Sequence, residues 1–90
     1  MYKRQVYDWL INHANTYGFY LVYTAKGEDR KTGYEEEKWH WTYKPISMHL
    51  TAFAREHLQD TTLSDFSGSD VAPQLHVVSD YVLGIHPSCH

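Results

Sequence analysis

Glu37 and His40 form a Glu-x-x-His pair whose residue types could act in metal-dependent hydrolysis. A neutral imidazole binds zinc well, and a nearby carboxylate can take a proton from zinc-bound water. Trp39 and Trp41 flank the histidine and would fix its ring and exclude water around it. Because residues three apart on a regular strand point to opposite faces, the pair shares one site only if Glu37 lies in a loop or bulge before the strand.

The same residues also have a purely structural interpretation, which their spacing leaves open. Glu37 ends a run of three consecutive glutamates, Glu35 to Glu37, and such runs usually belong to a solvated loop. A histidine between two tryptophans is usually a packed strand residue. Glu-x-x-His is therefore a weak pattern when it is taken alone.

The remaining histidines and the single cysteine are expected to be ordinary residues. His49 and His57 are eight apart and would lie roughly on one helix face, and the His-Pro-Ser-Cys-His tail could hold a metal loosely. We expect Cys89 to lie in a mobile end without a nucleophilic role. The histidines interpreted as ordinary surface or interface residues are His13, His49, His57, His76, His86 and His90.

An α+β arrangement is predicted for the elements that must hold the pair: a helix, an antiparallel two-stranded hairpin, and two to three further helices. Apolar residues at helical spacing predict a helix over residues 6–17, which Gly18 would end in the left-handed conformation. Aromatic and β-branched residues predict strands over residues 19–24 and 39–43, joined by a long loop.

The second half of the chain is predicted to be helical. Pro45 suits the first turn of a helix with an apolar stripe made of Ile46, Leu50, Phe53, Ala54 and Leu58. A turn or one-turn helix is expected over residues 61–67. A last helix, with Pro73 tolerated only in its first turn, is expected to end at Gly84 and to carry Val71, Leu75, Val78 and Val82 on one face.

Composition limits the classes of protein to which the chain can belong. Its 90 residues allow one small domain, and the 42% of hydrophobic residues are typical of a globular protein. The 8 Lys and Arg against 11 Asp and Glu argue against nucleic-acid binding. No apolar run approaches the roughly 20 residues of a membrane helix, no signal-peptide pattern opens the chain, and one cysteine excludes an internal disulfide.

Three pieces of sequence resemble the VanY-type D-alanyl-D-alanine carboxypeptidases, which are zinc LAS metallopeptidases. Trp9-Leu10 through Ala14 to Tyr17-Gly18-Phe19 is similar to the family's helix and the strand after it. Gly27-Glu28 to Thr32-Gly33-Tyr34 resembles its glycine-rich loop. The segment from Glu37 to Trp41 resembles its Glu-Pro-Trp-His-Trp motif, with Lys38 in the place of the proline.

This resemblance implies roles for particular residues. His40 matches the last zinc ligand, Glu37 matches the general base, and Trp39, Trp41 and Tyr34 match pocket-lining aromatic residues. The implied reaction is hydrolysis of the C-terminal residue of peptidoglycan stem peptides, in the periplasm or cell envelope. The family's other two zinc ligands lie upstream, in Ser-x-His-x-x-Gly-x-Ala-x-Asp, and this sequence does not contain that motif.

We therefore expect an incomplete part of a LAS-type domain that is inactive by itself. The alternative is a non-catalytic module, derived from that fold, that binds peptidoglycan or a protein. Residues 6–44 match the C-terminal half of the peptidase core, and residues 45–90 resemble the helical extension of one branch of the family. Residues 1–5 do not fit the family and look like translated adapter sequence, the alternative being a genuine basic start.

Overall fold

A computed structural model describes residues 2–90, with side chains described from Arg4 onward, so Met1 of the expected 1–5 start lies outside the described residues. The first helix, α1, spans Tyr2–His13 and continues as a 3-10 helix over Ala14–Tyr17. The helix predicted over residues 6–17 is confirmed, although it begins four residues earlier than predicted. Gly18 ends it with a φ of 90°, in the left-handed conformation expected for a glycine cap.

Two short antiparallel strands follow α1 and form the predicted hairpin. Strand β1 spans Phe19–Leu21 and β2 spans Trp41–Tyr43, with Phe19 opposite Tyr43 and Leu21 opposite Trp41. Both strands are shorter than predicted, because the chain leaves the regular ladder after Leu21 and joins it again only after His40. The α+β fold class is thus confirmed, and residues 22–40 form the loop that connects the strands.

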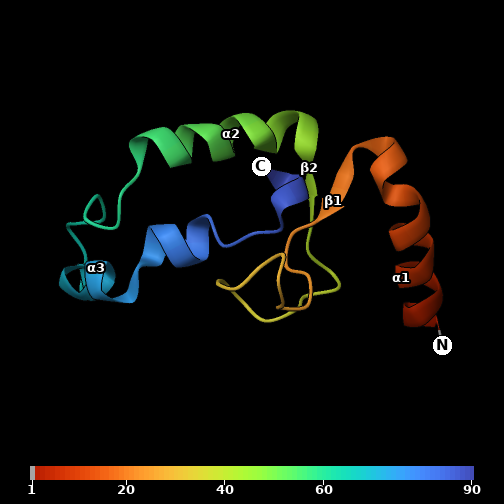
Figure 1. Cartoon of the computed structure of the whole chain (residues 1–90), viewed down its shortest axis with the longest axis horizontal. Coiled ribbons are helices and arrows are strands. Elements are labelled where there is room, and N and C mark those ends of the chain that lie inside the picture. The colour runs from red at the N-terminus through yellow and green to blue at the C-terminus, as the bar shows by residue number, and fades with distance from the viewer. Residues whose placement is uncertain (1) are drawn as a thin grey trace.

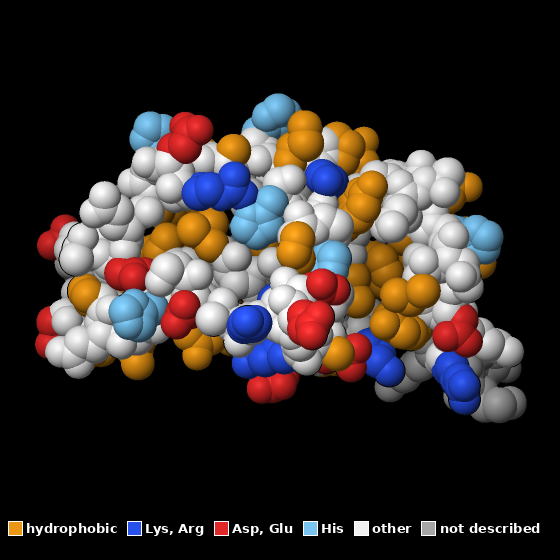
Figure 2. Space-filling model, viewed as in Figure 1, with side chains coloured by type: hydrophobic (Ala, Val, Ile, Leu, Met, Phe, Trp, Pro, Cys, Tyr) orange, Lys and Arg blue, Asp and Glu red, His pale blue; other side chains and the backbone are white. Residues whose placement is uncertain are grey.

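Helix α2 spans Lys44–His57 and begins directly after β2, with Pro45 in its first turn as predicted. Its predicted apolar stripe does not face a core. Ala54 is buried, but Ile46, Leu50 and Phe53 are 63%, 67% and 58% exposed. Figure 2 shows apolar side chains at the surface along α2 and between α1 and the rest of the molecule.

The segment after α2 agrees with one prediction and contradicts the other. Residues 61–67 form turns, which is one of the two expected forms, and the next helical residues are a 3-10 turn over Ser69–Val71 and the short helix α3 over Ala72–Leu75. The single last helix is broken at His76, which has a φ of 52°. The chain then continues as a π-helical segment over Val77–Val82, and Figure 1 shows this segment between α3 and the C-terminus.

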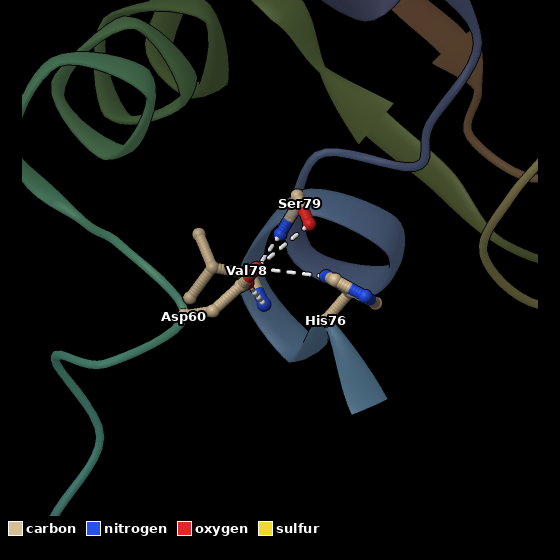
Figure 3. A network of polar contacts seen from close by, with 4 residues as sticks. All are labelled: Asp60, His76, Val78 and Ser79. Carbon is tan, nitrogen blue, oxygen red and sulfur yellow. Dashed lines mark hydrogen bonds and ion pairs between the residues drawn. The ribbon is translucent and has the colours of Figure 1, made fainter. Parts of the chain in front are cut away.

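The break at His76 is stabilised by Asp60, a residue that lies far away in the sequence (Figure 3). Its carboxylate accepts hydrogen bonds of 2.9 Å from the backbone N–H groups of Val78 and Ser79 and one of 3.0 Å from the Ser79 hydroxyl. The His76 ring nitrogen Nδ1 lies 3.4 Å from the same carboxylate. Because free N–H groups at a helix start need an acceptor, Asp60 allows a second helical segment to begin here.

Asp60 makes the stability of this segment depend on pH. Hydrogen bonds, the one from the Ser79 backbone first, hold the pKa of the carboxyl below its ordinary value of 3.8. The stabilisation is therefore present above that value and is lost as pH falls through the lower folded pKa. We expect Asp60→Asn to lower the urea midpoint at about pH 6 and to lower it less at about pH 3, which is below the ordinary value of 3.8. The exposed Asp70→Asn variant is the control, and an equal deficit at both pH values would contradict this role.

The core lies where the C-terminal tail meets β1. Val22, Tyr23 and Cys89 form a buried cluster, with Tyr20 and Ile85 packed against it. The prediction of a mobile tail is wrong, because Pro87–Cys89 form a 3-10 turn and the Cys89 side chain is fully buried. The His86 N–H donates to the Val22 carbonyl over 2.9 Å, which attaches the tail to the end of β1. Burial raises the pKa of the Cys89 thiol.

The helices within residues 2–90 are short, and none is apolar along its whole length. A spanning helix needs about 20 predominantly apolar residues. No helix in this part of the chain is long and apolar enough to cross a membrane.

Candidate functional site

The site is built on the loop that leads into β2, where Glu37 and His40 come together. The Glu37 carboxylate oxygen Oε1 lies 3.3 Å from His40 Nδ1. The backbone forms a turn between them, because the His40 N–H points to the Glu37 carbonyl at 3.3 Å. Glu37 lies in the loop before the strand, so the condition that the sequence sets for a shared site is met.

Two backbone hydrogen bonds hold this turn against the end of β1. The Glu37 N–H donates to the Tyr23 carbonyl over 2.9 Å, and the Val22 N–H donates to the His40 carbonyl over 3.0 Å. Val22 and Tyr23 belong to the buried cluster of the core. The catalytic candidates are therefore attached to the most buried part of the molecule, although they lie outside the regular strands.

The first and last glutamates of the acidic run, Glu35 and Glu37, differ in their surroundings. Glu35 forms an exposed ion pair of 3.3 Å with Lys26, and its side chain is 88% exposed. Glu37 turns inward, with a side chain that is 28% exposed, while that of His40 is 48% exposed. The solvated-loop interpretation thus describes Glu35, whereas Glu37 contacts the histidine and still reaches water.

Tyr23 is a buried residue that packs against His40, and sequence reasoning missed it. Its ring meets the His40 ring edge to face, with the centroids 5.1 Å apart. Burial, followed by the nearby Tyr34 and Glu37, raises the pKa of its phenol. Its only sequence signal is its position in an aromatic strand, which many core residues share.

The three predicted pocket aromatics have different places. Tyr34 is exposed and packs edge to face on Tyr23, the residue whose ring also contacts His40, with the Tyr34 and Tyr23 centroids 5.3 Å apart. Trp39 is 75% exposed. The Trp41 indole donates to the Lys38 carbonyl over 2.9 Å. Its ring lines a hollow that it shares with residues of α1 and of the C-terminal tail, and neither Glu37 nor His40 lines that hollow. The arrangement does not enclose His40 between the two tryptophans.

Among the residues that the structure describes, His40 has no further potential metal ligands gathered around it that would complete a metal site. Across residues 2–90, no group of three or more His, Cys, Asp or Glu side chains lies close enough to hold a metal ion. A catalytic zinc usually has three protein ligands and one open position. The described residues therefore fit one ligand position, at His40, and do not fit a whole zinc site.

Several other histidines have partners that explain them structurally. The His13 ring packs against Trp9 at 5.0 Å, and that of His57 against Phe53 at 4.4 Å. His86 lies 3.9 Å from Asp29, and His90 contacts Arg55. Burial and the adjacent guanidinium of Arg55 lower the pKa of His90.

Comparison with known protein families gives a match over the first half of the chain. The family model of VanY, D-alanyl-D-alanine carboxypeptidase, matches residues 1–46, just over half of the chain. The matched region contains α1, both strands, the connecting loop and the Glu37–His40 pair. Searches of curated proteins and of solved structures found no significant match.

Proposed function

Because the chain belongs to the VanY family of D-alanyl-D-alanine carboxypeptidases, we propose that it carries the C-terminal part of a zinc-dependent catalytic centre. The proposed reaction removes the C-terminal residue from peptidoglycan stem peptides, which places the enzyme in the periplasm or cell envelope. The observation that carries this proposal is the 3.3 Å contact between Glu37 and His40 within the matched region.

Glu37 is the proposed general base and His40 the proposed zinc ligand. The Glu37 carboxylate is partly exposed, so it can accept a proton from the attacking water and pass it to the leaving amine. In the completed domain, His40 would be one of the residues that hold zinc, and the metal would there supply Lewis acidity toward the scissile carbonyl. Tyr34, which packs on Tyr23, is proposed to line the substrate pocket, and Trp39 and Trp41 are proposed to contact substrate only in the completed domain.

On this proposal, the two further zinc ligands would come from a segment outside this chain. The described residues contain no three-ligand group, and the family's ligand motif does not occur in the sequence. Residues 45–90 would then be an extension of the enzyme and residues 6–44 a part of its core.

Metal analysis tests this proposal directly. We expect the purified 90-residue chain to hold far less than one zinc per chain after dialysis and to leave D-Ala-D-Ala peptides intact, because one imidazole binds zinc weakly. The control is the same measurement on His40→Ala, which should not differ. One tightly held zinc per chain that disappears in His40→Ala would refute the account of the missing ligands.

The same absence of a three-ligand group among the described residues favours a second candidate, a binding module without catalysis. Titration of a D-Ala-D-Ala stem peptide into the chain separates the two. Binding by the chain alone, combined with a gene that encodes no upstream ligand motif, would favour the module. An in-frame Ser-x-His-x-x-Gly-x-Ala-x-Asp segment would favour the enzyme.

A further inference from the structure

Arg30 is a buried cation in the loop between β1 and β2. Its residue is only 3% exposed, and within the described part of the chain no other charged residue is buried. The guanidinium donates to the Thr32 carbonyl through Nη1 over 2.6 Å and to the Thr24 carbonyl through Nη2. Its partners in this part of the chain are thus carbonyl oxygens, and its Nε has no hydrogen-bond partner there.

These contacts close the loop from Thr24 to Thr32, and the same guanidinium lies against Tyr23. Thr24 and Thr32 are eight residues apart, and one guanidinium joins their carbonyls because its donors form a rigid fork. The same group lies over the Tyr23 ring, with its central carbon 5.4 Å from the ring centroid. Arg30 therefore contacts the Tyr23 ring and, through its hydrogen bonds, also fixes the backbone of Thr24, the next residue in the chain.

Tyr23 is the residue that contacts both members of the catalytic pair. Its carbonyl accepts the Glu37 N–H, and its ring packs against the His40 ring. Burying a guanidinium is costly unless hydrogen bonds and other favourable contacts compensate for its lost hydration, and here two carbonyls and the Tyr23 ring do so. We propose that Arg30 is a positioning residue, which acts through Tyr23 to hold Glu37 and His40 in register; its importance for catalysis rests on the proposed function.

Hydrogen exchange and nuclear Overhauser effects on the 90-residue chain test this inference. In Arg30→Met, we expect the Glu37 amide to exchange about tenfold faster or more, and the Tyr23–His40 ring contacts to weaken. The Lys44 amide, bonded to Gly18 at the other end of the hairpin, and the amides of α2 should keep their wild-type protection. Lys31→Met is the matched control, because it removes one positive charge from an exposed neighbour.

Each outcome decides the matter. Unchanged Glu37 exchange and ring contacts in a folded Arg30→Met chain would overturn the inference. If all amides of Arg30→Met lose protection from exchange, the same measurements are made on Arg30→Gln, which keeps a donor near one of the two carbonyls. Loss across α2 in both variants would assign Arg30 to the stability of the whole fold and overturn the positioning role. These readouts need neither metal nor turnover, so failure of the proposed function would leave them interpretable.

Discussion

Glu37→Gln is expected to reduce turnover by about 10²- to 10⁴-fold, the usual contribution of a positioned general base, while zinc stays bound. The experiment uses a fusion in which a family segment with the Ser-x-His-x-x-Gly-x-Ala-x-Asp motif precedes this chain. Glutamine keeps the shape of Glu37 and an oxygen near His40 Nδ1, but it cannot accept the proton. Release of D-alanine and zinc content are measured on the same preparation.

Glu35→Gln is the matched control for this prediction. Glu35 lies two residues away, is largely exposed and pairs with Lys26, so its variant should turn over like the parent fusion. Full turnover in Glu37→Gln would remove Glu37 from the base role. Loss of both zinc and turnover would instead show that Glu37 orients the zinc-binding imidazole.

Gly33→Ala is expected to destabilise the chain by about 2–5 kcal/mol, a large share of the stability of a small domain. Gly33 has a φ of 89°, where a side chain is strained. A Cβ there would lie 2.2 Å from the Gly84 carbonyl oxygen. This close approach joins the glycine-rich loop to the C-terminal segment, so both would have to move apart. Urea unfolding followed by circular dichroism measures the change.

Variants of two other glycines separate the two causes of this loss, which are the strain of the left-handed backbone and the clash with Gly84. Gly68 has a φ of 88°, and no atom lies within 4 Å of the position that a Cβ would take, so Gly68→Ala should show the backbone strain alone. Gly27 has open space and no left-handed φ, and Gly27→Ala should be nearly neutral. Equal losses for Gly33→Ala and Gly68→Ala would mean that the contact with Gly84 contributes nothing.

Local sequence patterns predicted the elements that depend on neighbouring residues. The helix before Gly18, the hairpin and the helix with Pro45 in its first turn were recognisable, because periodicity, a left-handed glycine and the fixed φ of proline act within a few residues. The break at His76 was not recognisable. It depends on Asp60, whose carboxylate reaches the backbone across 18 and 19 residues of sequence.

The sequence by itself determined that Glu37 and His40 could share a site, because a three-residue spacing in a turn brings two side chains together. Only the tertiary structure decided what surrounds them. It placed Tyr23 beneath His40, buried Arg30 against Tyr23, and left Trp39 exposed. It also packed Cys89 into the core. The physical reason is that packing and desolvation depend on contacts between distant segments, and no local pattern records which segments will meet.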